Sequence, residues 1–354
     1  MHSYKKYYRV IGLMSGTSLD GLDLASCLFT RNYSSWDFTL ECATTVKYSV
    51  DWINLLKESE LSRNVENIDY KFGVFLAQSV QGFIKNHQLS NIDLIASHGH
   101  TLFHEPEKGI TVQIGNGAII AKELNIDTVS NFRQADVLLG GQGAPLVPIG
   151  DQLLFKDFPC CINVGGFANL SKKSEFGIAA WDICPANYVL NSLCNEINTE
   201  YDNEGNIART HAIHLPLLNE LNSIKFYEKN PPKSLAREWV NENIWPILNR
   251  YTISIEEKIA TFTEHAAIQI AESLPTNAMS LFTGGGTYNT FLMERIQHYN
   301  PAAQIVIPSN ELIEYKEALV FAFLGLLRYH GEVNILSSVT GATKDHSSGD
   351  LHGK

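Results

Sequence analysis

The stretch from Val10 to Leu24 constrains the fold of this chain more than any other part of the sequence. An apolar run leads into the sequence MSGTSLDG at residues 14–21, and an alternating apolar run follows it. This pattern predicts two strands joined by a tight, glycine-rich hairpin. Glycine lets backbone N–H groups approach a ligand closely, hydroxyl groups add donors for phosphate oxygens, and carboxylates hold Mg²⁺ directly or through water. Taken alone, the stretch also fits an ordinary hairpin turn.

Two further glycine clusters follow strand-like runs. Residues 160–171 repeat the first pattern, with Gly165 and Gly166 between two apolar runs, and the sequence GGG at 284–286 stands between a strand-like and a helix-like run. Two phosphate-type hairpins followed by a strand, three glycines and a helix are typical of the actin-like sugar-kinase fold. The sequence therefore predicts an α/β protein with two similar, ribonuclease-H-like lobes that hold ATP in the cleft between them.

The predicted boundaries follow this duplication. We expect lobe one over 1–131 and lobe two over 132–329, with the C-terminal segment 330–354 packing back on lobe one. Prolines 231 and 232 interrupt the preceding structure, and Ser234 is expected to cap a new helix. The tail from Lys344 is polar and predicts disorder. The expected strands are 24–30, 38–49, 92–97, 127–132, 160–164, 167–172 and 176–182, and the expected helices are 50–60, 68–86, 116–124, 255–274 and 317–329, with another from Asn187.

Composition limits the class of protein. The chain has 354 residues, of which 44% are hydrophobic, so two lobes can each build a core. Its net charge of -11 argues against nucleic acid or an anionic membrane as a partner. The six cysteines form no Cys-x-x-Cys pair and indicate buried thiols in a reducing compartment. Since no apolar run has the length of a signal peptide or a membrane span, we expect a soluble, cytoplasmic protein.

A few polar residues follow predicted strands. Asp182 closes a strand-like run before a proline-containing turn, a rigid place that suits a general base, although a helix N-cap or an Asx turn fits equally well. Three imidazoles, those of His98, His100 and His104, follow another strand. Without a matching acid or cysteine cluster, we expect these to contact substrate or lie in loops rather than bind zinc.

Charged residues elsewhere allow two interpretations each. Arg133 could bind a ligand carboxylate with its planar fork, or form a structural ion pair with Asp136. Glu317 is expected to begin the last apolar helix, where a glutamate complements the helix dipole, and nothing local marks it as functional. Asp20 could hold the water shell of Mg²⁺, and Asp23 could do the same or pair with lobe two. Alternatively, one of them could support the hairpin turn.

With these segments in view, the chain resembles the anhydro-N-acetylmuramic acid kinases of bacterial cell-wall recycling from about residue 9 to about residue 343. The sequences MSGTSLDG at 14–21 and GGQGAPLVP at 140–148 are specific to that family. Other stretches that carry the resemblance are SHGHT at 97–101, QIG at 113–115, FRQADV at 132–137, NVGGFAN at 163–169, Asp182 with Pro185 and Asn187, PPKS at 231–234, GGG at 284–286 with Asn289, and SVTGA at 338–342.

The resemblance implies an activity and its residues. Members of the family use ATP and Mg²⁺ to open the 1,6-anhydro ring of the amino sugar with water while phosphorylating O6, and a homodimer is expected from the resemblance. Asp182 matches the catalytic aspartate, Arg133 and Glu317 match positions that meet the sugar, and His98 lies in a motif close to it. The residues that match ATP- or phosphate-binding positions are Gly16, Thr17, Ser18, Leu19, Asp20, Gly21, Leu22, Asp23, Gly165, Gly166, Gly284, Gly285, Gly286 and Asn289.

The chain departs from the family pattern around the expected base. Cys184 and Ala186 stand where the family often has glycines, which predicts a bulkier turn after Asp182. His100 stands where glutamine is frequent, and Asn116 with Gly117 replaces a common Asp-Pro. Two other functions remain open at this point. One is an ordinary amino-sugar kinase that phosphorylates a free hydroxyl, and the other is a non-catalytic ATP-binding sensor on the same fold.

Overall fold

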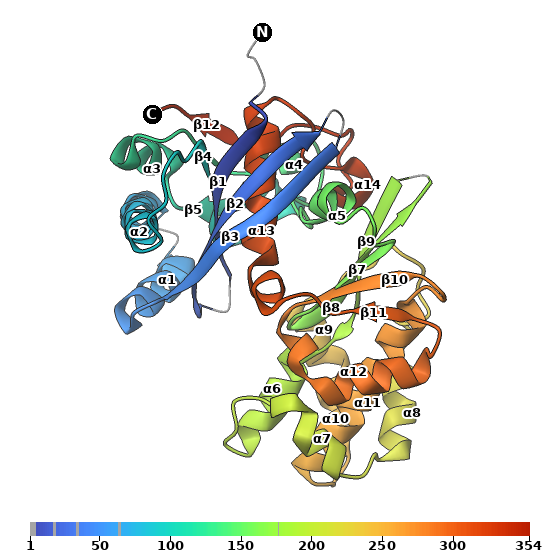
Figure 1. Ribbon diagram of the computed structural model, residues 1–354. Coiled ribbons are helices and arrows are strands. Elements are labelled where there is room, and N and C mark those ends of the chain that lie inside the picture. The colour runs from blue at the N-terminus through green and yellow to red at the C-terminus, as the bar shows by residue number, and fades with distance from the viewer. Residues whose placement is uncertain (1–4, 17–18, 33–34, 63–64, 176) are drawn as a thin grey trace. The chain divides into compact units, whose positions relative to one another are not determined.

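The computed structural model divides the chain into two compact units (Figure 1). It describes residues 5–16, 19–32, 35–62, 65–175 and 177–354. Unit 1 comprises residues 1–155 and 315–354, and unit 2 comprises residues 156–314. The expected division at 131/132 and 329/330 therefore differs from the observed one at both ends. Two short helices and most of one long helix, all expected in lobe two, pack within unit 1.

Unit 1 is built on a mixed sheet whose strands lie in the order β12-β6-β4-β1-β2-β3, with β5 paired to β4. The glycine-rich hairpin is confirmed, because β1 and β2 pair antiparallel up to Ser15 opposite Leu22. Strand β3 pairs antiparallel with β2, whereas β4 runs parallel to β1 and β6 parallel to β4. The strands are β1 (Tyr7–Ser15), β2 (Gly21–Asn32), β3 (Ser35–Lys47), β4 (Leu94–Glu105), β5 (Ile110–Ile114), β6 (Thr128–Ser130) and β12 (Asp350–His352).

Unit 2 repeats this arrangement in a sheet of order β11-β10-β7-β8-β9. Here β7, β8 and β9 form the antiparallel meander, β10 runs parallel to β7, and β11 runs parallel to β10. Because both sheets place three antiparallel strands beside two parallel ones in the same order, the predicted duplication of an α/β lobe is confirmed. The strands are β7 (Cys160–Val164), β8 (Phe167–Ser174), β9 (Gly177–Pro185), β10 (Met279–Thr283) and β11 (Gln304–Val306).

Helices cover both faces of the unit 1 sheet. Ile11 and Leu13 of β1 share a core with residues of α1 (Val50–Ser62), α2 (Val65–Asn86) and α3 (Gly117–Leu124). The alternate residue Gly12 faces α13 (Asn310–Tyr329), and a Cβ there would lie 1.9 Å from the carbonyl oxygen of Ala318. Successive strand residues point to opposite faces, so one strand serves both layers. The other helices of unit 1 are α4 (Gln134–Leu138), α5 (Pro148–Leu154) and α14 (Ser337–Thr340), with a 3₁₀ turn, η1 (Pro106–Lys108).

Helix α11 (Ile255–Ser273) runs through the centre of unit 2. Its first half packs in one apolar cluster and its second half in another, which also contains residues of β7 and β9. Ser254 caps this helix reciprocally with Glu257. The remaining helical elements are α6 (Asn187–Glu196), η2 (Asn203–Gly205), α7 (Asn206–Thr210), α8 (Leu215–Asn222), α9 (Arg237–Asn243), α10 (Trp245–Arg250), η3 (Gly285–Tyr288) and α12 (Thr290–Tyr299).

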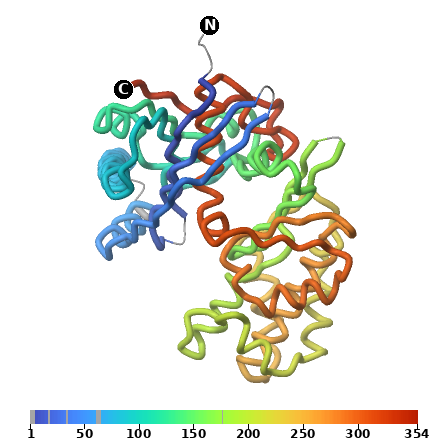
Figure 2. The backbone as a smooth tube through the Cα atoms, viewed as in Figure 1, coloured from blue at the N-terminus to red at the C-terminus, as the bar shows by residue number. Residues whose placement is uncertain are grey.

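Three local expectations are wrong. The tail from Lys344 is ordered, since β12 pairs antiparallel with β6 at the edge of the unit 1 sheet, near the end marked C in Figure 2. Ser234 does not cap a helix, because α9 begins at Arg237 after Ala236. Glu317 lies in the middle of α13 rather than at its start. The apolar face at 319–327 is buried in the chain itself. No helix in the described ranges is both long and apolar enough to span a membrane.

Candidate active site

The first glycine hairpin is packed too closely for side chains at one of its glycines. A Cβ at Gly21 would lie 2.7 Å from Cγ2 of Thr45 and 2.8 Å from the carbonyl oxygen of Val46. Leu19 has a φ of 61°, and its N–H lies 3.4 Å from the carbonyl oxygen of Gly16. Thr17 and Ser18, two of the expected phosphate-binding residues, lie outside the described residues. At the end of the turn, Gly21 therefore packs closely against β3, where no side chain fits.

Two carboxylates flank this turn. Asp20 is exposed, and Oδ1 of Asp23 accepts a hydrogen bond of 2.6 Å from the hydroxyl of Thr45. Oxygen donors of this kind are the ligands that Mg²⁺ prefers. The residues present therefore fit the expected ion, with Asp20 the more accessible of the two.

The other two glycine clusters lie together at the end of β7. A Cβ at Gly284, whose φ is +84°, would lie 2.5 Å from Oδ1 of Asn163, and one at Gly286 would lie 2.3 Å from Cγ1 of Val164. A Cβ at Gly165 would lie 3.3 Å from Nδ2 of the same Asn163. Asn163, two residues before Gly165, thus lies next to both clusters, a position for which the sequence pattern alone gave no signal.

Each of these clusters also lies beside the start of a helix. The carbonyl oxygen of Gly166 accepts hydrogen bonds from the N–H groups of Ala186 and Tyr188, so the second hairpin is tied to the start of α6. Asn289 follows the third cluster, and its side chain caps α12 by accepting from the N–H of Leu292 at 2.9 Å. The cap uses the Asn289 carbonyl oxygen and leaves its amide group for other partners.

Asp182 lies within β9, three residues before the strand ends, so the N-cap interpretation is wrong. It pairs with Asn169 across a register shift in the β8–β9 ladder. Its Oδ2 accepts a hydrogen bond of 2.7 Å from the N–H of Leu235, and its own N–H donates to the carbonyl oxygen of Lys233 at 3.0 Å. The segment PPKS and the residue after it therefore hold the carboxylate in place.

The surroundings of Asp182 favour its protonated form. The side chain is half-buried, and this desolvation raises its pKa above the ordinary value, while the Leu235 N–H acts in the opposite direction. Oδ1 makes no hydrogen bond with any residue in the part of the chain that the structure describes. A fixed carboxylate with one oxygen unengaged and a raised pKa has the properties of a general base.

The two departures next to Asp182 are absorbed by the core. Cys184 and Ala186 are both 0% exposed and belong to the apolar cluster that contains Ala266 of α11. Their side chains therefore add to packing inside unit 2 instead of narrowing the surroundings of the carboxylate. Burial also raises the pKa of the Cys184 thiol, which keeps it neutral.

In unit 1, Arg133 is bonded on two sides. Its Nε donates to Nε2 of His98 at 2.9 Å, and its Nη1 donates to the carbonyl oxygen of Gly143 at 2.7 Å. The Nδ1–H of His98 then donates to the carbonyl oxygen of Gly99 at 3.0 Å. Burial, with Arg133 as the next cause, lowers the pKa of His98, which keeps the imidazole neutral and able to accept from the guanidinium.

Glu317 and Arg133 act on each other electrostatically. Desolvation lowers the pKa of Arg133 to about 10, and the charge of Glu317 works against that shift. Desolvation by the surrounding atoms raises the pKa of Glu317, with Arg133 as the main opposing influence, although the glutamate side chain keeps exposed surface. An arginine and a glutamate in one polar region can together recognise a ligand that carries both a carboxylate and hydroxyl groups.

The three imidazoles do not converge. His98 contacts Arg133, Nδ1 of His100 lies 2.8 Å from the hydroxyl of Ser15, and Nδ1 of His104 lies 3.0 Å from the hydroxyl of Thr111. Each histidine therefore has a separate local partner. A cavity of about 280 Å³ opens beside His98, and Asp69, Gln113 and Asn116 give it a polar lining that suits a hydroxyl-rich ligand.

The family model and the curated relatives that match this chain agree on one family. The family model described as anhydro-N-acetylmuramic acid kinase matches residues 8–354. A curated protein of that name from Mannheimia succiniciproducens is 35% identical, covering 99% of this chain and 100% of the relative. Relatives of the same name from Bacillus cereus and Crocosphaera subtropica are 32% and 33% identical, each covering 97% of this chain and 98% of the relative.

Proposed function

Since the chain belongs to the anhydro-N-acetylmuramic acid kinase family, we propose that it opens 1,6-anhydro-N-acetylmuramic acid with water and phosphorylates O6 from ATP, with Asp182 as the general base. The observation that carries this proposal is the state of Asp182. Its carboxylate is held by the Leu235 N–H, is partly desolvated, and has its pKa raised.

The proposed reaction balances with one base. Water attacks C1 of the sugar and gives its proton to the carboxylate of Asp182. The C1–O6 bond breaks, and O6 forms a bond to the γ-phosphorus of ATP as the bond to the β,γ-bridging oxygen breaks. The phosphoryl group thus takes the place of the proton that a general acid supplies in ordinary glycoside hydrolysis. The products are N-acetylmuramic acid 6-phosphate and ADP, and one proton is released.

The three glycine clusters are proposed to bind the nucleotide. The hairpin residues Gly16 to Asp23 and the pair Gly165 and Gly166 would meet the phosphates, and Gly284 to Gly286 with Asn289 would meet the adenosine. The open space at Gly285, where a Cβ would meet no described atom within 4 Å, supports this assignment, because a ligand can approach the backbone there. Asp20 would hold Mg²⁺, which when bound offsets negative charge on the phosphates.

Arg133, His98 and Glu317 are proposed to bind the sugar. With Nε and Nη1 bonded to His98 and Gly143, the remaining edge of the Arg133 guanidinium suits the lactyl carboxylate of the muramic acid. A homodimer and a cytoplasmic location are also proposed, on the family resemblance alone.

The first test uses purified protein with ATP, Mg²⁺ and the anhydro sugar in ¹⁸O-water, read by mass spectrometry. We expect a 6-phosphate with one ¹⁸O at C1, and Asp182→Asn should lose about 10²–10⁴-fold in rate. Asp157→Asn is the matched control, because that aspartate is exposed in the same unit.

Other outcomes identify the alternatives. Phosphorylation of a reducing amino sugar without solvent oxygen at C1 would indicate an ordinary sugar kinase. Nucleotide binding without turnover on any sugar would indicate a sensor. Retention of full activity by Asp182→Asn would exclude this residue as the base.

A further inference from the structure

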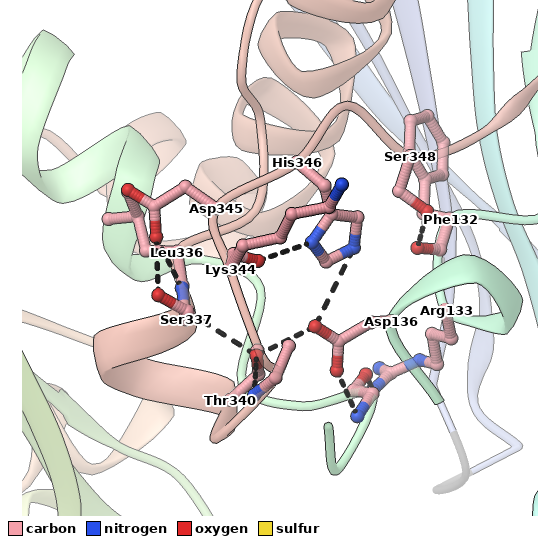
Figure 3. Close-up of polar contacts among 12 residues, drawn as sticks. Phe132, Arg133, Asp136, Leu336, Ser337, Thr340, Lys344, Asp345, His346 and Ser348 are labelled. Carbon is pink, nitrogen blue, oxygen red and sulfur yellow. Dashed lines mark hydrogen bonds and ion pairs between the residues drawn. The ribbon is translucent and has the colours of Figure 1, made fainter. Parts of the chain in front are cut away.

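A fully buried carboxylate, Asp136, lies one helical turn after Arg133. It is 0% exposed, and both of its oxygens accept hydrogen bonds. Oδ1 accepts from the hydroxyl of Thr340 at 2.7 Å, and Oδ2 accepts from the N–H of Gly143, also at 2.7 Å (Figure 3). The expected ion pair between Arg133 and Asp136 is therefore replaced, among the described residues, by two separate sets of partners.

Gly143 links Asp136 to Arg133. Its N–H donates to Asp136, while its carbonyl oxygen accepts from Nη1 of Arg133. Its φ of +67° favours glycine, and a Cβ there would lie 2.9 Å from Cγ2 of Val137. Because one residue uses both backbone groups in this way, the position of the Asp136 carboxylate determines where the carbonyl that holds the guanidinium lies.

The C-terminal segment closes this network from the other side. The N–H of Gln142 donates to the carbonyl oxygen of Thr340 at 2.8 Å, and the N–H of Thr343 donates to that of Leu139 at 3.1 Å. Nε2 of His346 lies 3.7 Å from Oδ1 of Asp136. In Figure 3, Thr340 and His346 both lie on the C-terminal segment and point toward Asp136. The loop 140–143 is thus fixed by residues that are some two hundred positions away in the sequence.

We propose that Asp136 and Thr340 are positioning residues, which orient Arg133 for the carboxylate of the sugar through Gly143. The inference rests on the proposed function for the identity of that ligand. With two of its groups bonded to His98 and Gly143, Arg133 has Nη2 without a hydrogen bond to any residue that the structure describes. The Nη2 group can donate to the sugar in a fixed direction only while the Gly143 carbonyl holds the guanidinium in place. Loss of the Thr340 hydroxyl disturbs Asp136 and, through Gly143, Arg133, and thereby weakens sugar binding.

The test is Thr340→Val, which keeps the side-chain shape and removes the donor. We expect the KM for the anhydro sugar to rise about tenfold, with kcat and the KM for ATP within about twofold of the wild type, since the lost interaction is made equally in the ground and transition states. Thr340→Ser should restore the wild-type KM. Thr343→Val is the matched control, an exposed threonine in the same segment.

A double-mutant cycle separates positioning from general damage. In an Arg133→Ala background, Thr340→Val should raise the KM for the sugar no further, because its effect passes through Arg133. Additive effects, or equal increases in the KM for ATP, would overturn the proposal. So would a Thr340→Ser variant that is as impaired as Thr340→Val.

A spectroscopic readout keeps the inference independent of turnover. The Nε–H signal of Arg133, assigned with Arg133→Lys, should be sharp and slowly exchanging in the wild type and should broaden or shift in Thr340→Val. If the wild type does not act on the anhydro sugar, the proposed function fails while this measurement still decides the positioning role. An unchanged Arg133 signal in Thr340→Val would overturn that role.

Discussion

The partial burial that suits Asp182 to act as a base also lowers the free energy of unfolding of the protein. The pKa of Asp182 in the folded protein is raised above the ordinary value, so folding favours the protonated form and the ionised form destabilises the native state at neutral pH. We therefore expect Asp182→Asn to raise the free energy of unfolding at pH 7 while it removes activity. The amide can still accept from the Leu235 N–H, which preserves the local hydrogen bond.

The pH dependence of the stability difference between wild type and Asp182→Asn tests the direction of this effect. The destabilisation is present above the folded pKa and disappears as the pH falls below the ordinary pKa of an aspartate, so the two proteins should converge in stability in acid. Urea unfolding of both at pH 7 and again near that ordinary pKa measures the difference. An Asn variant that is less stable than the wild type at pH 7 would contradict a desolvated carboxylate.

At the residue scale, the sequence predicts which residues belong to the candidate site better than it predicts their hydrogen-bond partners. Its motifs point to Asp182 and Arg133, but the contacts that orient them come from Leu235 and His98, which are distant along the chain. The pairing of Arg133 with Asp136 is a reasonable hypothesis for close neighbours. It fails because Thr340, from the other end of the chain, and Gly143 donate to the two oxygens of Asp136, while Arg133 donates to His98 and to the Gly143 carbonyl.

At the scale of elements, the contact of β1 with α13 depends on a missing side chain. A Cβ at Gly12 would lie 1.9 Å from the carbonyl oxygen of Ala318, which is backbone and cannot rotate away. Gly12→Ala must therefore push the helix off the strand, and we expect a loss of about 1–3 kcal/mol or more in the free energy of unfolding. Because α13 carries Glu317, the KM for the sugar should rise as well.

The control for this prediction is another glycine of unit 1. A Cβ at Gly82, inside α2, would meet nothing within 4 Å. Gly82→Ala should stabilise the protein by about 0.5–1 kcal/mol, since alanine has the higher helix propensity. Denaturant midpoints of the two variants should therefore move in opposite directions. A shift of the same sign in both would show that the β1–α13 contact is not the cause.

Elements with a strong local pattern can be predicted well. The apolar spacing at 68–86 identifies α2, and the glycine-rich turns identify both hairpins. The segment 231–234 and the tail lack such a pattern, and they are held by hydrogen bonds to β9 and β6, respectively. Long-range partners of this kind leave no period in a single sequence.

At the scale of the whole molecule, the repeated strand order can be anticipated, whereas the boundaries of the units cannot. The first two glycine clusters indicate two copies of one topology, because each lies in the hairpin between the first two strands of its unit. The chain leaves unit 1 after Phe155 and returns to it at Tyr315, within α13. A boundary inside a continuous helix has no composition signal, since the helical pattern runs on through that point.

Both units also contain a histidine that is buried in its neutral form. Burial lowers the pKa of His100 in unit 1 to about 4 and that of His265 in unit 2 to about 3. His265 is hydrogen-bonded to Asn222 at 2.6 Å and to the hydroxyl of Tyr227 at 2.9 Å. In the unfolded chain each imidazole binds a proton below its ordinary pKa, so the unfolded state takes up protons that the native state does not.

Stability should therefore fall as the pH drops from about 6.5, by about 1.4 kcal/mol per pH unit for each such imidazole. Calorimetry between pH 7 and pH 5 should show falling transition temperatures for both units. His265→Gln should flatten this dependence for unit 2, whereas the exposed His298→Gln should leave it unchanged. A transition temperature of the wild type that does not change over this range would mean that these imidazoles are protonated in the native protein. Both ring nitrogens of His265 would then be donors, with the Tyr227 hydroxyl oxygen as the acceptor of the second hydrogen bond.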